Sequence, residues 1–179
     1  MTGDALEEKR SNGDICIQAC ADDPQVAFHA IRNLIRIAGG RAVVAWNQQA
    51  FGRTSSTSTS QVTARNLFGF KDGTNNLKVE SPNLLKKHVW TSSENSANSP
   101  AWMEGGSYLA ARRIRMNIET WDRTRLREQE EIVGRTKVTG APLSGGDEFS
   151  APNFSEKGRS GPLIPADAHM RLMHPDQNE

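Results

Sequence analysis

The chain has 179 residues, enough for one domain or two small ones. Its 22 basic and 21 acidic side chains nearly cancel, so the net charge of +1 gives no indication of a nucleic-acid partner. A hydrophobic content of 36% and a mean hydropathy of -0.62 are low for a complete globular domain and fit a polar, loop-rich chain or part of a larger protein. We expect neither a membrane span, which needs roughly 20 apolar residues, nor a signal peptide within this sequence.

The first 50 residues have the pattern of a strand, a helix and a second strand. Residues 14–20 alternate between apolar and polar side chains, which predicts a strand with one apolar face. Asp23 and Pro24 then suit the N-cap and first residue of a helix, which two glycines at 39–40 end. Residues 42–46 predict the second strand, so the three elements form a βαβ unit, half of a ferredoxin-like domain. The apolar stripe expected on the helix consists of Ala27, Ile31, Leu34, Ile35 and Ala38.

The chain contains two cysteines, Cys16 and Cys20, both inside the first expected strand. On a strand, residues four apart lie about 13 Å from each other, at roughly 3.3 Å per residue. A disulfide needs Cα atoms within about 7 Å. We therefore expect neither a disulfide between them nor a metal site built on the pair.

The middle of the chain begins with a polar connector. Arg53 to Arg65 contains a run of serine and threonine and almost no apolar residue, which predicts an exposed linker at a domain boundary. Residues 84–90 suggest a short helix or strand, and residues 108–118 alternate as a long strand does. A charged helix is expected over Trp121 to Val133, with Leu126, Ile132 and Val133 facing the core. Residues 139–165 are dense in Gly, Pro and Ser, as in a ligand-lining lid or, alternatively, a disordered segment.

One acid stands between two glycines in the run Gly69-Phe70-Lys71-Asp72-Gly73. Glycine allows backbone angles closed to other residues and lets a ligand approach the main chain. Asp72 is therefore expected at the edge of a site. A plain turn is the alternative, and that role is compatible with catalysis.

Two histidines lie near the C-terminus, His169 and His174. A single histidine in such a stretch can be an ordinary surface or core residue. The pair could also belong to a zinc site with help from Asp167 and Asp176, but the absence of a nearby cysteine disfavours zinc. His29 and His88 match no motif.

These stretches together resemble a known family. Gly69-Phe70-Lys71-Asp72-Gly73, and His169-Met170-Arg171 followed by His174-Pro175, resemble the dye-decolorizing peroxidases, a haem family, and within it the secreted deferrochelatase/peroxidase branch. The similarity continues through residues 13–23 and through Gly134-Arg135-Thr136-Lys137. It covers nearly all of this chain but only part of the family's length, so the chain is expected to be truncated at both ends.

The resemblance implies an α+β fold made of ferredoxin-like βαβ units with antiparallel sheet, part of a two-domain arrangement. Residues 1–52 would be the C-terminal half of the first ferredoxin-like domain, and residues 53–65 the linker. Residues 66–179 would be an incomplete second ferredoxin-like domain that carries the haem site.

The resemblance also implies roles for individual residues. Haem b, with one iron, would be held by His169 as the proximal ligand, the common choice in haem proteins. Asp72 would be the distal catalytic acid/base that moves the peroxide proton, a role that favours acidic pH. The remaining residues expected around the cofactor are Gly73, Thr74, Asn75, His174, Pro175 and Asp176.

The implied activity is oxidation of organic donors by hydrogen peroxide, and iron release from haem in the same branch. The family's distal arginine follows the proximal histidine, and no arginine follows Arg171 here. A haem-binding fragment with little or no catalysis is therefore the alternative, and a ferredoxin-like interaction module without a working site is a third. The resemblance implies a periplasmic or secreted protein whose export signal lies upstream of Met1. Its partners would be peroxide, an organic donor or haem, and a second copy or iron-uptake components, with no nucleic acid.

Overall fold

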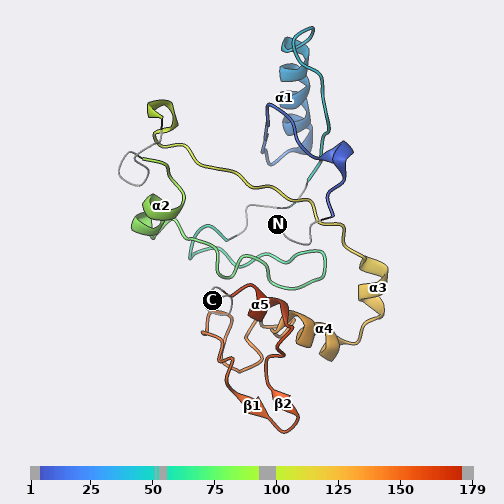
Figure 1. Cartoon of the computed structure of the whole chain (residues 1–179), viewed down its shortest axis with the longest axis vertical. Helices are drawn as coiled ribbons and strands as arrows, with labels where there is room; N and C mark the ends of the chain where they lie inside the picture. Colours follow the sequence, from blue (N-terminus) through green and yellow to red (C-terminus); the bar gives the residue numbers. More distant parts are fainter. Residues whose placement is uncertain (1–4, 51, 53–55, 93–99, 175–179) are drawn as a thin grey trace. The chain divides into compact units, whose positions relative to one another are not determined.

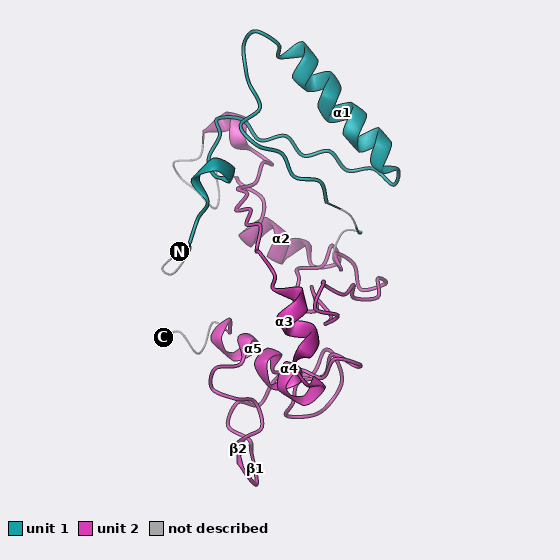
Figure 2. Cartoon of the chain, turned by 90° about the vertical axis from the view of Figure 1, so that its right-hand side faces the viewer, with its two compact units in different colours: residues 1–53 teal, residues 54–179 magenta. Residues whose placement is uncertain are grey.

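The computed structural model describes residues 5–50, 52, 56–92 and 100–174. The chain divides into two compact units, residues 1–53 (unit 1) and residues 54–179 (unit 2), coloured separately in Figure 2. Helices combined with a small antiparallel sheet give the α+β fold class that the sequence predicts. None of the helices in the described ranges is long and apolar enough to cross a bilayer.

Unit 1 contains a 3₁₀ helix, η1 (Glu8–Arg10), and the helix α1 (Pro24–Ile37) (Figure 1). The start predicted for α1 is confirmed, because the Asp23 side chain accepts a hydrogen bond from the Gln25 backbone N–H at 2.8 Å. Pro24 occupies the first helical position, where its missing N–H removes no hydrogen bond. No residue of α1 is buried, so its apolar stripe is only half covered.

The two strands expected in unit 1 are not formed. Residues 14–20 and 42–46 are assigned to no strand, although the Trp46 indole N–H donates to the carbonyl of Asn12, just before the first segment, at 2.8 Å. Val43 is 94% exposed. Alternating side chains favour an extended backbone locally, but a strand also needs a partner, and the described residues of unit 1 supply none. Cys16 and Cys20 are free and exposed, and they do not lie on a strand.

Unit 2 holds the remaining elements. The segment at 84–90 proves to be the helix α2 (Pro82–His88), and a 3₁₀ helix, η2 (Ala101–Met103), follows. The helices α3 (Ile118–Arg123) and α4 (Leu126–Val133) come next. The hairpin of β1 (Lys157–Gly158) and β2 (Gly161–Pro162), antiparallel with Lys157 opposite Pro162, precedes the helix α5 (His169–Leu172).

The long strand predicted over residues 108–118 is wrong in this structure. Residues 107–117 belong to no strand of the described chain, and Figure 1 shows them as a long irregular trace that leads into α3, to which residue 118 already belongs. Tyr108 is 81% exposed and Ile114 is 76% exposed. The alternation is present in the sequence, but hydrogen bonding from a neighbouring strand is not, and alternation alone cannot supply it.

The single helix predicted over Trp121 to Val133 is also wrong, because it is broken at Thr124 and Arg125. Both residues adopt extended backbone angles, with ψ of 134° and 146°. The break is stabilised by Gln129, which is 4% exposed and donates its side-chain amide to the carbonyls of Trp121 at 2.9 Å and Thr124 at 3.1 Å. The rotation at the break turns two of the expected core residues outward: Leu126 is 52% exposed and Ile132 is 46% exposed, whereas Val133 is half-buried.

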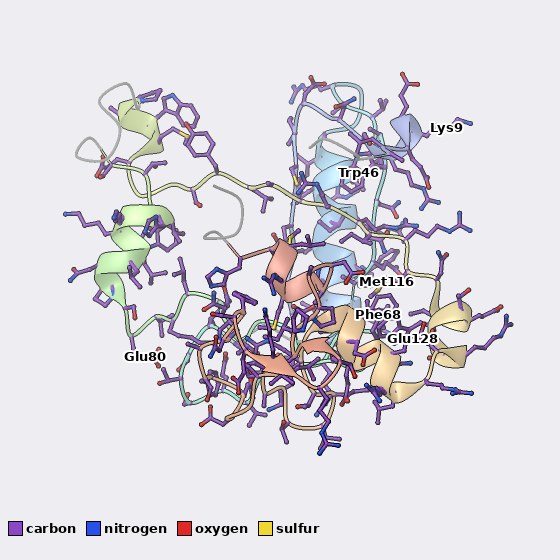
Figure 3. All side chains as sticks on the ribbon, turned by 60° about the horizontal axis from the view of Figure 1, so that its bottom comes forward. Lys9, Trp46, Phe68, Glu80, Met116 and Glu128 are labelled. Atoms are coloured by element: carbon purple, nitrogen blue, oxygen red, sulfur yellow. The ribbon has the colours of Figure 1, made fainter. Side chains whose placement is uncertain are left out.

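The serine/threonine run is less exposed than expected. Ser56 and Thr63 are buried. The Glu80 carboxylate, labelled in Figure 3, accepts hydrogen bonds from the Ser58 hydroxyl at 2.6 Å and the Thr59 backbone N–H at 3.1 Å. Residues 56–63 therefore contact the rest of unit 2 at several points, while residues 59–62 are exposed as the sequence predicts. The ferredoxin-like division at residues 53–65 stays a prediction.

The apolar core of unit 2 is small, and it joins distant parts of the sequence. Phe70 (3% exposed) and Ala141 (5%) belong to it, together with Ile164 and Ala168 (both 0%). These four residues come from the stretch around Asp72, the Gly/Pro/Ser-rich segment and the start of α5. The core therefore lies among the segments that carry the expected site residues.

Candidate functional site

Asp72 lies at the end of a tight backbone loop. Arg65 and Lys71 pair as an isolated antiparallel bridge, and the Asp72 backbone N–H donates to the Ala64 carbonyl at 2.9 Å. Inside the loop, the Asn66 side-chain oxygen accepts from backbone N–H groups two and four residues later, at 3.0 and 3.3 Å. The loop is thus built from hydrogen bonds, and its exit presents the exposed Asp72 side chain, as the sequence predicts.

Aromatic packing anchors this loop to α3. The buried Phe70 ring meets Trp121 edge-on, with ring centroids 5.9 Å apart, and the Phe68 ring stacks on Trp121 at 4.4 Å. The Trp121 indole N–H donates to the Phe68 carbonyl at 3.2 Å. Lys137 completes the packing with its ammonium 5.4 Å from the Phe70 centroid. The apolar side chain two residues before Asp72 is therefore held on both sides.

An open apolar hollow of about 340 Å³ lies beside these aromatic residues. Phe68 and Met116, labelled in Figure 3, line it together with Ile114 and Trp121. No sequence motif indicates this hollow, because its walls come from three segments that only the fold brings together.

A buried acid contacts both flanks of Asp72. The carboxylate of Glu148, 9% exposed, forms an ion pair with Lys71 and accepts a hydrogen bond from the Thr74 hydroxyl at 3.1 Å. Burial by itself raises the pKa of Glu148, but hydrogen bonds led by that from Lys71, together with the lysine's charge, outweigh it, so the net pKa lies below the usual 4.5. Glu148 is therefore a carboxylate near neutral pH.

His169 is the first residue of α5 and is exposed. The Met173 backbone N–H donates to the His169 carbonyl at 3.0 Å, so helical geometry continues to Met173. Residues three and four positions apart share a helix face. Leu172 (51% exposed) and Met173 (65%) therefore lie on the side of α5 that carries the imidazole. An exposed imidazole of this kind can ligate a metal ion, and the apolar side chains beside it can contact a flat apolar group that carries the metal.

The helix α5 is held from its other side by Arg171. The Arg171 guanidinium donates to the carbonyls of Phe154 at 3.1 Å and Ile164 at 3.3 Å, and lies 5.3 Å from the Phe154 ring centroid. The half-buried His174 packs edge-on against the same ring at 5.1 Å. Arg171 and His174 thus fix the orientation of the helix, whose imidazole at residue 169 remains exposed.

Gly134, the C-cap of α4, is in contact with α5. It has φ of 87°, and a Cβ added there would lie 2.8 Å from Met170 Cγ and 3.3 Å from the Ala168 methyl. Only glycine combines this backbone angle with so close an approach. Residues 134–148 therefore contact α5 at one end and, through Glu148, the Asp72 loop at the other.

The remaining predicted site residues are only partly placed. Gly73 and Thr74 are half-buried and Asn75 is exposed, all directly after Asp72. Pro175 and Asp176 lie outside the described residues. Among the described residues, no group of three or more His, Cys, Asp or Glu side chains could hold a metal ion, so the zinc alternative gains no support.

Sequence reasoning missed Glu148 and Arg135 as site residues. Arg135 appears in the resemblance but was given no role, and Glu148 stands beside another acid, Asp147, in a Gly/Pro/Ser-rich segment. Nothing in the local pattern distinguishes the two acids. In the structure Glu148 is buried and Asp147 is exposed, which follows from contacts with residues more than 70 positions away.

Two family descriptions match the chain. The family described as "Dyp-type peroxidase, N-terminal" matches residues 1–52, and "Dyp-type peroxidase, C-terminal" matches residues 63–179. Among curated proteins, the chain is 42% identical over 173 residues to a protein named deferrochelatase from Yersinia pseudotuberculosis, covering 96% of this chain and 39% of that protein. It is 38% identical to the deferrochelatase of Escherichia coli (strain K12), covering 96% of this chain and 40% of that protein.

Solved structures give the same result. A DyP-type peroxidase from Streptomyces coelicolor is 39% identical with a TM-score of 0.82, covering 99% of this chain and 47% of that one. The structure titled ferric DtpA from Streptomyces lividans is 39% identical with a TM-score of 0.81, over the same shares of the two chains. The chain spans about two fifths of the length of the curated relatives and about half that of these structures.

Proposed function

This chain belongs to the Dyp-type peroxidase family, and from that premise we propose that it is part of a haem-dependent peroxidase in which His169 binds the iron and Asp72 moves the peroxide proton. The observation that carries the proposal is the exposed imidazole of His169 beside Leu172 and Met173 on one face of α5. It lies in the same compact unit as the Asp72 loop.

The residues present fit a haem group. The iron of a haem commonly takes an axial imidazole, and the porphyrin around it needs apolar contacts. The His169 imidazole is exposed, so no burial in the protein interior prevents ligation, and two partly exposed apolar side chains flank it. Arg171 holds the helix through backbone carbonyls, so the ligand would be presented on a fixed support.

Haem, when bound, supplies the oxidising chemistry, and the chain supplies orientation and proton transfer. His169 would ligate the iron through an imidazole nitrogen. Asp72, as an exposed carboxylate, would accept the proton of a peroxide and return it to the leaving oxygen, which is general acid–base catalysis. Gly73, Thr74 and Asn75 would line the edge of the group, with His174, Pro175 and Asp176 near its periphery.

Hydrogen peroxide and a bulky organic donor are the proposed substrates. The curated relatives carry the name deferrochelatase, which supports iron release from haem as a second activity of the same site. A periplasmic or secreted location, and association with a second copy or with iron-uptake components, stay predictions from the family resemblance.

The first test is titration of haem into the purified chain, followed by the Soret band. We expect a saturable complex with a histidine-ligated ferric spectrum that His169→Ala abolishes. His88→Ala is the matched control, because His88 is an exposed histidine at the end of another short helix in unit 2. Equal haem binding by the His169→Ala and wild-type chains would rule out His169 as the ligand.

Peroxide turnover by the haem-loaded chain then separates a peroxidase from a haem-binding protein without catalysis. General acid–base catalysis contributes about 10²–10⁴-fold, so Asp72→Asn should lower turnover by a factor in that range. Asp122→Asn, which removes the same charge from the exposed surface of α3, is expected to retain wild-type turnover. Equal loss in both variants would exclude a specific role for Asp72.

A further inference from the structure

Five residues form a polar cluster next to Asp72, called here the Glu148 cluster: Glu148, Lys71, Thr74, Arg135 and Gly140. Lys71 immediately precedes Asp72 in the sequence, and Thr74 follows it by two positions. Both side chains bind the one carboxylate of Glu148. Asp72, the residue proposed to transfer protons, therefore lies between two residues whose side chains both bind the Glu148 carboxylate.

The Lys71–Glu148 ion pair is nearly buried, with side chains 17% and 10% exposed. An ion pair removed from water is stable only when both charges remain matched, and removing one partner leaves an uncompensated charge. Such a pair has one well-defined arrangement, whereas a surface pair exchanges among many. Lys71 therefore has little freedom to move, and the backbone that it shares with Asp72 is restrained with it.

Gly140 makes room for this pair. It has φ of 78°, and a Cβ added there would lie 2.8 Å from Lys71 Cδ and 3.4 Å from Glu148 Cγ. Any side chain at position 140 would push the lysine away from the acid. The close approach thus depends on a glycine in the left-handed region.

Arg135 holds the backbone on both sides of the pair. One nitrogen of its guanidinium donates to the Gly140 carbonyl at 2.7 Å and to the Glu148 carbonyl at 2.9 Å. Burial lowers the pKa of Arg135 and the nearby Glu148 raises it, yet a guanidinium stays charged in proteins. The backbone of Glu148 is therefore fixed independently of its side chain, so the carboxylate is presented to the Asp72 loop from a rigid support.

We propose that Glu148 is a positioning residue that holds the Asp72 loop in one conformation by binding Lys71 and Thr74 on its two flanks. The effect of Glu148 on catalysis rests on the proposed function of Asp72. A group that transfers a proton must stay within hydrogen-bond reach of its substrate. Glu148 is buried against Lys71 and is not among the residues expected around the cofactor, so it would act through its neighbours. The structural part of the inference concerns the haem-free chain and can be tested there.

The structural test uses ¹H–¹⁵N NMR of the full haem-free chain. Glu148→Gln keeps the shape of the side chain and removes its charge. We expect the backbone amide resonances of Gly73 and Thr74 to shift, and Lys71→Met to shift them in the same direction. The double variant should add little beyond either single one, because both remove the same ion pair. Glu156→Gln, the same substitution at an exposed acid of unit 2, should leave both resonances unchanged.

A second variant guards against loss of folding in Glu148→Gln. Thr74→Val removes one hydrogen bond to Glu148 and leaves the ion pair in place, so it should shift the Gly73 amide by a smaller amount in a folded chain. Unchanged Gly73 and Thr74 resonances in a folded Glu148→Gln chain, or an unchanged Gly73 resonance in folded Thr74→Val, would overturn the proposal.

The catalytic test uses the haem-loaded chain. A displacement of about 1 Å in a catalytic group can lower a rate by about 10²-fold. Glu148→Gln should therefore lower kcat by about 10- to 100-fold while KM for the organic donor and the haem titration stay at wild-type values. An unchanged kcat, or a change in haem affinity alone, would contradict a positioning role. Failure of the wild-type chain to bind haem would instead refute the proposed function, and the NMR result would still decide the role of Glu148 in the loop.

Discussion

The two segments that carry the proposed site are held by different forces. Besides the aromatic packing of Phe68 and Phe70, the Asp72 loop depends on a nearly buried ion pair, Lys71 with Glu148. Besides the hydrogen bonds of Arg171 to backbone carbonyls, the helix α5 depends on close packing, with Ala168 fully buried and Gly134 in close contact with Met170. The stabilisation from a charged contact changes with pH, whereas that from a packed contact changes with the size and shape of the side chains. The two segments should therefore fail under different perturbations.

The largest effect is expected from a change in shape beside α5. Gly134→Ala adds a methyl group 2.8 Å from Met170 Cγ at a residue with φ of 87°. The left-handed angle costs an alanine about 1–2 kcal/mol and overpacking costs about 1–3 kcal/mol. We expect unit 2 to lose about 2–5 kcal/mol of unfolding free energy in urea denaturation.

A matched glycine separates the two contributions at position 134. Gly145 has φ of 101° and nothing within 4 Å of an added Cβ, so Gly145→Ala should show only the backbone part, about 1–2 kcal/mol. Equal destabilisation by the two variants would mean that Gly134 is not in tight contact with α5.

The next effect is a response to acid on the side of the Asp72 loop. The pKa of Glu148 in the folded chain is lowered, so the stabilisation from its charge is present above the usual value of 4.5 and is lost as pH falls below it. We expect the urea concentration at the unfolding midpoint of wild-type unit 2 to decrease as the pH is lowered below 4.5. The decrease should be smaller in Glu148→Gln. Gly134→Ala should retain the full wild-type pH dependence.

Glu80 contributes to the same pH window and must be separated from Glu148. Hydrogen bonds led by that from Ser58 lower the pKa of Glu80 from 4.5 to about 2, so its contribution is also lost on acidification, between those values. Glu80→Gln serves as the comparison variant. If Glu80→Gln alone removed the whole pH dependence, the Glu148 pair would carry none of it.

The smallest effect is expected from a charge pair on the surface. Arg127 and Glu131 form an ion pair one helical turn apart on α4, with an N–O distance of 2.9 Å and the arginine side chain 87% exposed. Exposed pairs of this kind contribute about 0.3–0.5 kcal/mol. Arg127→Ala should therefore lower the unfolding free energy by no more than about 0.5 kcal/mol. A loss above 1 kcal/mol would show that exposure does not distinguish this pair from the Lys71–Glu148 pair.

Local signals in the sequence predicted the parts of the fold that local physics controls. The start of α1 follows from an Asp–Pro pair, because a cap and a preset φ angle act within a few residues. The end of α1 just before Gly39 follows in the same way. By contrast, the alternating residues at 14–20, 42–46 and 108–118 indicated strands that are not formed, since strand pairing depends on a partner elsewhere.

The candidate site divides in the same manner. Glycines around Asp72 and the family motif at His169 were sufficient to name the two central residues, whose roles stay predictions. The structure finds both side chains exposed. The supporting residues could not be named in this way, because the contacts of Glu148, Gly140 and Gly134 join positions far apart in the chain.

The sequence by itself determined the family, the first helix with its cap, and the two stretches that carry the proposed chemistry. The tertiary structure alone decided which of two adjacent acids, Asp147 or Glu148, is buried beside Asp72, and that the helix predicted over 121–133 breaks at Thr124 and Arg125. The physical reason is the distance along the sequence over which each interaction acts. Capping and turn formation act between near neighbours, whereas burial of a charge depends on a partner that the fold brings from another part of the chain.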